Sequence, residues 1–146
     1  MYSNIKPATF LEGPNGPAVH RTHVVIPLEA NQREYKLEEK TTLENNYLVG
    51  LWVTKPDTVV ESGRQIAADA VFDSAYINLR TGTNEVIRKL YLRQILDVNQ
   101  SGCPYEISIA DKINLVESEV KVMNDSNIAA DTVLEIQFDY VVSRRR

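Results

Sequence analysis

The sequence predicts an all-β protein, an antiparallel β-sandwich with little helix and an extended N-terminal arm. Three observations favour this fold. The 146 residues include 16 Val, 11 Ile and 9 Thr, and β-branched side chains fit the half-buried surface of a pleated sheet. Several short runs alternate apolar and polar residues, which is the period of a strand. Turn-forming residues separate these runs about every 8–12 residues, without the alternation of strands and helices that marks a parallel sheet.

Residues 1–18 form the first predicted element, an arm. Three prolines and two glycines exclude a long helix or a central strand there. Two interpretations stay open: a solvated terminus, or an arm that docks on a neighbouring subunit. For the second interpretation, the candidate interface residues in the arm are Pro7, Phe10, Leu11, Pro14 and Pro17.

The body is predicted as one domain over residues 19–142, with seven to nine short strands. Its clearest strand is the last, where apolar and polar residues alternate without exception over residues 134–140. A period of two places Glu135, Gln137 and Asp139 on the face opposite the apolar residues. We therefore predict a core in which Leu134, Ile136 and Phe138 point inward and face five other residues: Ile77, Leu79, Ile107, Ile109 and Leu115.

Further strands are predicted, in chain order, at residues 24–26, 33–37, 47–53, 71–79 and 105–109. Asp73 is the one exception to the alternation of residues 71–79. The run 47–53 is apolar on both faces, which is typical of a central or an interface strand, so Trp52 is a candidate interface residue. Another strand is expected to begin at Ile113 and to continue at residues 120–122 after a β-bulge, because its alternation slips by one residue.

The segment 85–96 allows two structures. It can continue as a strand from a hairpin turn at residues 81–84, or it can form a helix capped by Asn84. We favour a strand that ends at Leu92 and is followed by a short helical turn. Residues 65–70 are compatible with one more helical turn.

Composition excludes several classes of protein. Sixteen basic residues stand against 20 acidic ones, and the net charge of −4 argues against a general nucleic-acid coat. No apolar run approaches the roughly 18 residues that a membrane span needs, and residues 1–6 lack the pattern of a secretory signal. Cys103 is the single cysteine, so folding in a reducing cytosol, without disulfides, is the simplest interpretation.

The sequence contains no catalytic or metal-binding pattern. His20 and His23 fall on opposite faces of the predicted first strand, so we interpret them as surface histidines. The loop aspartates lack the spacing of a calcium loop. Glu117 and Glu119 could share a strand face, and a solvated face explains them equally well. We predict a protein that is not an enzyme and that has no metal or cofactor.

The C-terminal residues 143–146 include a basic tail of Arg144, Arg145 and Arg146. Three adjacent positive charges can contact phosphates of nucleic acid or lipid, or an acidic patch on a partner. The alternative is a solvated terminus. Three charges add little affinity in one copy, but many copies in an assembly act together.

The chain consists of an arm followed by an all-β body, which includes residues 76–84, the segment Ile113-Asn114-Leu115 and a closing strand at 132–142. This layout resembles small β-sandwich structural proteins of bacteriophages. The resemblance is to single jelly-roll capsid and vertex (penton) proteins. It implies a jelly roll and a self-assembling capsid, penton or minor capsid subunit. It also implies that the partners are copies of the chain and other virion proteins, and that the protein is located in the virion after assembly in the host cytoplasm.

A ligand-binding β-sandwich is the second hypothesis, for example a sugar-binding or receptor-binding module of a spike or tail. Such modules stack sugar rings on aromatic side chains that a flat face or a cleft presents. This chain has one Trp, and most of its seven Tyr fall at core-like strand positions. The sequence therefore favours the structural subunit.

Overall fold

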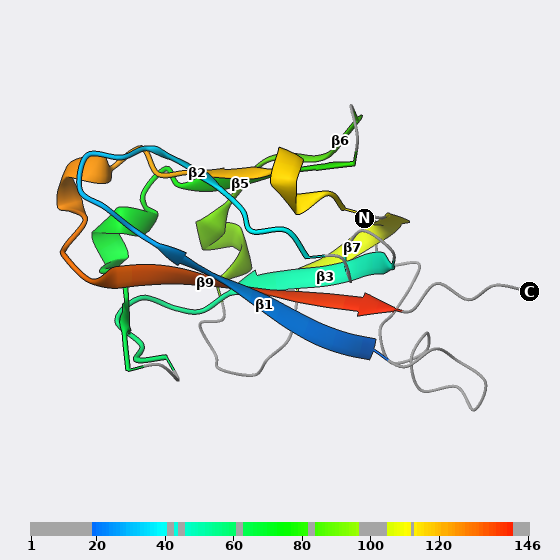
Figure 1. Ribbon diagram of the computed structural model, residues 1–146, viewed down its shortest axis with the longest axis horizontal. Helices are drawn as coiled ribbons and strands as arrows, with labels where there is room; N and C mark the ends of the chain where they lie inside the picture. Colours follow the sequence, from blue (N-terminus) through cyan, green and yellow to red (C-terminus); the bar gives the residue numbers. More distant parts are fainter. Residues whose placement is uncertain are drawn as a thin grey trace, which may run out of the picture.

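The computed structural model describes residues 19–40, 43, 46–60, 63–81, 84–96, 105–111 and 113–141, and at residues 19, 84 and 105–111 it describes the backbone. Strands dominate these ranges; Leu43 is helical, and four 3₁₀ turns are the other helical elements among the described residues. The strands form two sheets that lie one over the other (Figure 1). The all-β fold with two antiparallel sheets, predicted from the sequence, is confirmed.

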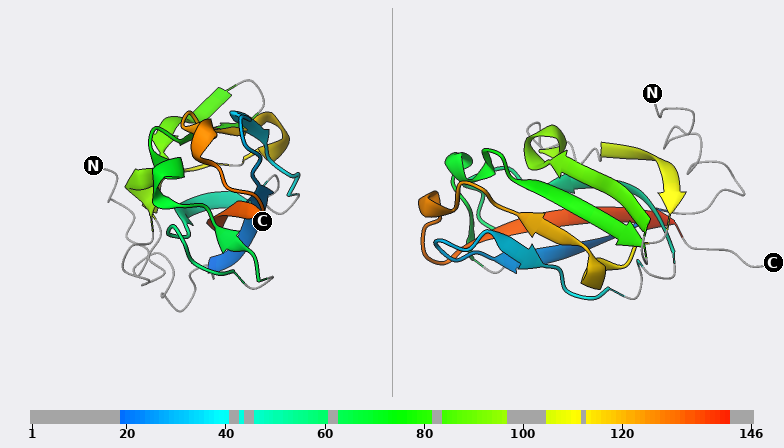
Figure 2. Two further views of the ribbon diagram at one scale, coloured as in Figure 1. Left: turned by 90° about the vertical axis from the view of Figure 1, so that its left-hand side faces the viewer. Right: turned by 90° about the horizontal axis from the view of Figure 1, so that it is seen from above.

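The larger sheet contains four strands in the order β1 (Val19–Pro27), β9 (Thr132–Val141), β3 (Tyr47–Val53) and β7 (Tyr105–Asp111). The two-residue strand β4 (Gln65–Ile66) also pairs with β9, and it is parallel to β9. The other sheet has the order β2 (Glu34–Lys36), β8 (Glu119–Lys121), β5 (Tyr76–Thr81) and β6 (Asn84–Tyr91). In the right-hand view of Figure 2 this four-stranded sheet lies in front of β9 and β1.

The strand pairs are nested around the middle of the chain. β5 and β6 form a hairpin, β3 pairs with β7, β2 pairs with β8, and β1 pairs with β9, all antiparallel. Most connections therefore pass from one sheet to the other. The first and last strands lie side by side, with Val19 directly opposite Val141.

Connections gather at one end of the body, in the left half of Figure 1. We call this the loop end; it consists of residues 28–33, 67–75, 92–96 and 123–131. It includes the 3₁₀ turns η1 (Asp69–Phe72), η2 (Leu92–Ile95) and η4 (Asp125–Asn127). The start of β1 and the finish of β9 lie at the opposite end (Figure 1).

The core lies between the two sheets and agrees with the predicted alternation. Leu134, Ile136 and Phe138 of β9 are fully buried, at 0% exposure. From the facing sheet, Ile77 and Leu79 are buried as completely, and so is Leu115. These predictions are confirmed. Ile107 and Ile109 lie in β7 as predicted, but the structure describes only their backbone.

The predicted strand over residues 71–79 is wrong in its first half. Strand β5 begins only at Tyr76, and Val71 lies in the turn η1. Ser74 adopts a left-handed backbone with φ of 61°, which interrupts an extended chain. Val71 and Ala75 are buried, but they reach the core from a turn, so their spacing imitated a strand. The helical turn considered at residues 65–70 lies later, since Gln65 and Ile66 form β4.

The strand expected to begin at Ile113 is also wrong. Residues Leu115–Glu117 form the 3₁₀ turn η3, and β8 begins only at Glu119. The side chain of Asn114 accepts a hydrogen bond from the Val116 N–H at 3.0 Å, and such a local bond competes with sheet pairing. Because Glu117 lies in this turn, Glu117 and Glu119 do not share a strand face. A 3₁₀ turn, rather than a bulge, causes the slip in alternation.

The remaining strand predictions are confirmed, although β1 begins at Val19, five residues before the predicted run 24–26. Segment 85–96 is a strand to Tyr91 followed by the 3₁₀ turn η2, one residue earlier than predicted. The apolar run 47–53 is the central strand β3, flanked by β9 and β7. Its register with β9 shifts between Leu48 and Gly50, an irregularity that the sequence did not reveal.

The predicted arm and basic tail lie outside the described residues. This applies to the arm residues Pro7, Phe10, Leu11, Pro14 and Pro17, and to Arg144, Arg145 and Arg146. The docking arm and the phosphate-binding tail therefore stay predictions. Their points of attachment are described, because β1 begins at Val19 and β9 ends at Val141.

Candidate functional site

The outer side of the four-stranded sheet presents two ordered rows of side chains. Tyr35, Val120, Ile77 and Leu90 stand opposite one another across the strands and are all buried, so their neighbours in sequence point outward. We call this surface the tyrosine face. Its first row is Glu34, Lys121, Tyr76 and Tyr91. Its second row is Lys36, Glu119 and Asn78, and Lys89 joins this row through its hydrogen bond to Asn78.

Two tyrosines lie side by side on the tyrosine face. The rings of Tyr76 and Tyr91 meet edge to face, with centroids 5.8 Å apart and an interplanar angle of 75°. Tyr91 is 41% exposed. Ile77 and Leu90 occupy the inward positions beside this pair, so these two tyrosines are not among those at core-like positions.

Lys89 beside this pair has an unusual backbone. Its φ is 54°, in the left-handed region that a lysine seldom adopts. The Lys89 N–H donates to Oδ1 of Asn78 at 2.7 Å, and Asn78 donates from Nδ2 to Oε2 of Glu119 at 3.1 Å. Asn78 is only 9% exposed although it points outward. The Lys89 ammonium lies 5.4 Å from the centroid of the Tyr76 ring, close enough for a cation–π interaction.

Opposite charges alternate over the rest of the tyrosine face. Nζ of Lys36 lies 3.6 Å from Glu119 and 3.8 Å from Glu34. Interaction with the neighbouring Glu34 carboxyl outweighs partial burial and lowers the pKa of the Glu119 carboxyl, and Asn78 and the neighbouring lysines lower it further. Glu119 is therefore ionised at neutral pH and is a firm acceptor for Asn78.

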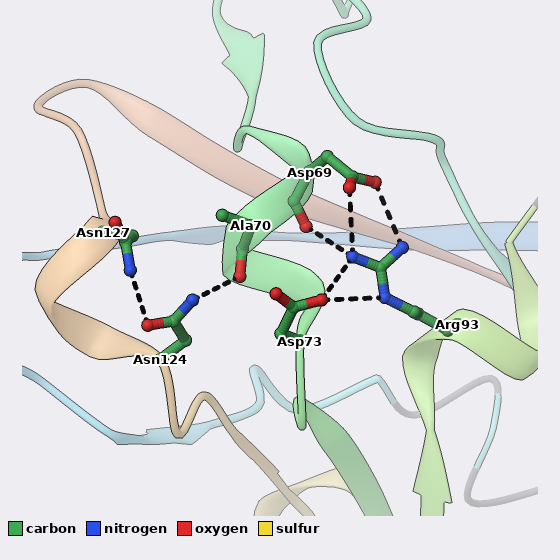
Figure 3. Close-up of polar contacts among 6 residues, drawn as sticks. All are labelled: Asp69, Ala70, Asp73, Arg93, Asn124 and Asn127. Carbon is green, nitrogen blue, oxygen red and sulfur yellow. Dashed lines mark hydrogen bonds and ion pairs between the residues drawn. The ribbon is translucent and has the colours of Figure 1, made fainter.

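At the loop end, one guanidinium joins two connections (Figure 3). Arg93 of η2 reaches both ends of η1: Nη1 lies 3.1 Å from Asp69 Oδ1, and Nη2 lies 2.6 Å from Asp73 Oδ1. Nη2 also donates to the backbone oxygen of Asp69 at 2.9 Å. The hydrogen bond from Arg93 lowers the pKa of the Asp69 carboxyl below its ordinary value.

Two asparagines attach a third connection to the same place (Figure 3). Asn124 donates from Nδ2 to the backbone oxygen of Ala70 at 2.7 Å, and Asn127 donates to Oδ1 of Asn124 at 2.6 Å. A fourth connection joins through Arg33, whose Nε lies 3.4 Å from Asp125. From the sequence, Asp69, Asp73 and Asp125 were loop residues with no assigned partner. The fold brings them to arginines that are distant in sequence.

Replacing Arg93 with Gln will lower the melting temperature at pH 7 more than replacing Arg88 with Gln. Arg88 is a matched control on β6, with a single 3.8 Å contact to Glu85. Because the folded pKa of Asp69 lies below the unfolded one, the stabilisation is complete above the unfolded pKa of about 4 and is lost as the pH falls through the folded pKa. Thermal unfolding measures this effect. We therefore expect the melting temperatures of wild type and Arg93→Gln to differ at pH 7 and to differ less at pH 3. An equal effect of Arg88→Gln at pH 7 would contradict this role.

The candidate interface residue Trp52 lies on the outer side of the larger sheet. The Arg21 guanidinium lies 5.2 Å from the Trp52 ring centroid and binds Asp139 with both carboxylate oxygens, at 2.7 Å and 3.1 Å. Trp52 is half-buried, and its indole N–H has no acceptor within the part of the chain that the structure describes. Arg21 thus covers part of the outer apolar side of β3. The interface role of Trp52 stays a prediction.

A hollow of about 400 Å³ opens beside the loop end. Its lining includes Glu29, Arg64 and Asp131, with residues 27–28, Ala30 and Ala130 around them. The lining residues include no histidine, cysteine or serine. The hollow therefore combines opposite charges without a nucleophile.

The two histidines lie on opposite faces of β1, as predicted. His20 stands opposite Tyr140 and stacks on its ring at 5.5 Å, whereas His23 stands opposite Gln137. Within the described ranges, no three His, Cys, Asp or Glu side chains gather as a metal ion requires. No helix among those same residues is long and apolar enough to cross a membrane.

Comparison with known proteins gave no relative. No protein-family model matches this chain, and no curated protein or solved structure matches it. The strand pairing, the tyrosine face and the loop end are the features that bear on function.

Proposed function

We propose that the protein is a jelly-roll structural subunit of a bacteriophage virion, a capsid or vertex (penton or minor capsid) protein that associates with copies of itself. The nested strand pairing carries this proposal. Apart from the short β4, the first strand pairs with the last, the second with the second-last, and so on to the central hairpin. A long hairpin of eight strands folded into two sheets is the pattern of a jelly roll, an architecture that recurs in viral capsid and lectin domains.

The positions of the two chain ends support a role for the arm in assembly. Residues 1–18 and 142–146 attach side by side, because Val19 and Val141 are opposite each other at the end away from the loops. An extended chain of 18 residues spans up to about 60 Å. The nine-residue strand β1 is about 30 Å long. An extended arm is therefore long enough to cross its own body and reach a neighbouring subunit.

The partners that we propose follow from this arrangement. Copies of the chain and other virion proteins are the main ones, and the virion, assembled in the host cytoplasm, is the proposed location. Because β9 ends opposite the start of β1, we propose that the Arg144–Arg146 tail acts at the same end of the body as the arm. Nucleic-acid or lipid phosphates are the proposed ligands of the tail.

Deleting residues 1–18 will leave a folded body that associates more weakly. Proline restricts φ in the free arm, so a proline-rich arm loses less conformational entropy on docking than a flexible one. Native mass spectrometry across a concentration series measures association. A chain whose residues 1–18 are replaced by an equally long Gly/Ser segment is the control, and it should behave like the deletion.

Removing Arg144–Arg146 should weaken association chiefly at low salt, where charge is least screened. The same native mass spectrometry measures this change.

An arm deletion that associates as strongly as the intact chain would contradict the docking role of the arm. So would a Gly/Ser arm that restores association, because length alone would then suffice.

A ligand-binding module is the second candidate function. The specific observation in its favour is the Tyr76–Tyr91 pair on the outer side of the four-stranded sheet, where aromatic rings are open to a ligand. Jelly rolls also occur in lectins, so the strand pairing is compatible with this function too.

A further inference from the structure

Tyr91 is a fixed aromatic surface. Its ring meets Tyr76 edge to face, and its N–H donates to Oε1 of Gln94 at 3.3 Å. The next N–H, of Leu92, donates to the backbone oxygen of Ala75 at 2.9 Å. Arg93 then binds Asp73, three residues before Tyr76. The segments that carry the two tyrosines are therefore tied together at the loop end, and 41% of Tyr91 is open to solvent.

Lys89 is a strained cation beside this surface. Its left-handed backbone is maintained by the buried Asn78, which uses both its amide nitrogen and its amide oxygen for that purpose. Strained backbone of this kind is found preferentially at ligand-binding sites. Among the described residues, no carboxylate lies within ion-pair distance of the Lys89 ammonium. Lys89 thus places a positive charge, with no ion pair to a described carboxylate, next to the two rings.

The charges around Lys89 define the ligand. A carboxylate on the ligand would neutralise Lys89, and a sugar ring has the apolar C–H face that packs on an aromatic ring. Glu34 has a half-exposed side chain that can accept hydrogen bonds from hydroxyls. The carboxylates of Glu34 and Glu119 alternate with Lys36 and Lys121 on this face, which suits isolated carboxylates better than the continuous phosphates of a nucleic acid. A saccharide with isolated carboxylates fits this mixture better than a nucleic acid.

We infer that the tyrosine face binds an acidic saccharide, with a sugar ring on Tyr91 and the sugar carboxylate on Lys89. The inference gives a ligand class to the second candidate function and rests on that function. It does not depend on assembly, because the face belongs to a single chain.

The test measures binding of two acidic oligosaccharides, trigalacturonate and 3′-sialyllactose, against their uncharged counterparts galactotriose and lactose. Isothermal titration calorimetry or NMR titration of the intact chain should show binding of at least one acidic sugar, about tenfold tighter than its neutral counterpart. Lys89→Gly is the decisive variant, because glycine accepts a φ of 54° without strain. It should melt at the wild-type temperature or above, and it should lose the preference for the acidic sugar.

Two further variants separate stacking from charge. Tyr91→Ala should weaken the acidic sugar about tenfold, and Tyr91→Trp should retain it, since either aromatic ring offers a stacking face. Lys55→Ala is the matched control: it removes one positive charge from the segment after β3, away from the tyrosine face, and should leave the affinity unchanged.

Three results would overturn the inference. They are no binding of either acidic sugar at millimolar concentration, unchanged acidic-sugar affinity in Lys89→Gly, and tighter binding of oligothymidylate than of either acidic sugar. The mass of the chain in solution is measured separately, so failure to bind sugar and failure to assemble are distinguishable.

Discussion

Replacing Phe138 with Ala will lower the free energy of unfolding by about 3–5 kcal/mol. Phe138 has 0% exposure and lies near the middle of β9, the strand that pairs with both β1 and β3. Truncation removes the transfer free energy of the ring and leaves a cavity that the paired strands cannot close. Since domains of this kind are stable by only about 5–15 kcal/mol in total, the variant will be close to unfolding.

Urea unfolding followed by circular dichroism measures this change, and Gln137→Ala is the matched control. Gln137 is the preceding residue of β9, points outward and is only half-buried, so its truncation should cost less than about 1 kcal/mol. If Phe138→Ala unfolds at the same urea concentration as wild type, the inward face of β9 has been misassigned.

The second large effect will come from Arg21. Asp139 is 4% exposed and receives two charge-assisted hydrogen bonds from Arg21, so Arg21→Met leaves a buried carboxylate without its partner. Loss of one partner in a fully buried pair costs about 3–5 kcal/mol. The Arg21 side chain is 45% exposed and water screens the pair, so we expect about 2 kcal/mol.

A double-mutant cycle tests this expectation. Arg21→Met combined with Asp139→Asn should recover part of the lost stability, because the asparagine amide leaves no unpaired charge buried at the sheet. Arg33→Met is the control, since Arg33 is 61% exposed and its pair with Asp125 should contribute less than about 1 kcal/mol. An Arg21→Met variant that is no less stable than Arg33→Met would show that Asp139 does not depend on Arg21.

The sequence was sufficient to identify the inward face of β9. Alternation over residues 134–140 survives in the structure because β9 is paired on both sides, which keeps it extended and sets one face against the core. The same rule failed for Val71, in a 3₁₀ turn, and for Ala75, after that turn, because their burial produces similar spacing. The spacing of apolar residues therefore predicts which residues are buried. It predicts the type of secondary structure only where the alternating run is long.

The polar contacts were beyond sequence reasoning because they join distant residues. Asp139 was predicted to point outward, which is correct, yet it is buried by Arg21, 118 positions earlier in the chain. The left-handed Lys89 depends on an oxygen of Asn78 on the neighbouring strand. No signal in the sequence marked Asn78, because a polar residue between two core residues, Ile77 and Leu79, is what an ordinary strand carries on its outer face.

Self-association of the intact chain is the most direct test of the proposed assembly role. Native mass spectrometry over a wide concentration range, together with a search for the chain in purified phage particles, makes the measurement. We expect oligomers of defined size that grow with concentration, and the chain among the particle proteins. A chain that stays monomeric at high concentration and is absent from particles would contradict the structural-subunit proposal and favour the ligand-binding function.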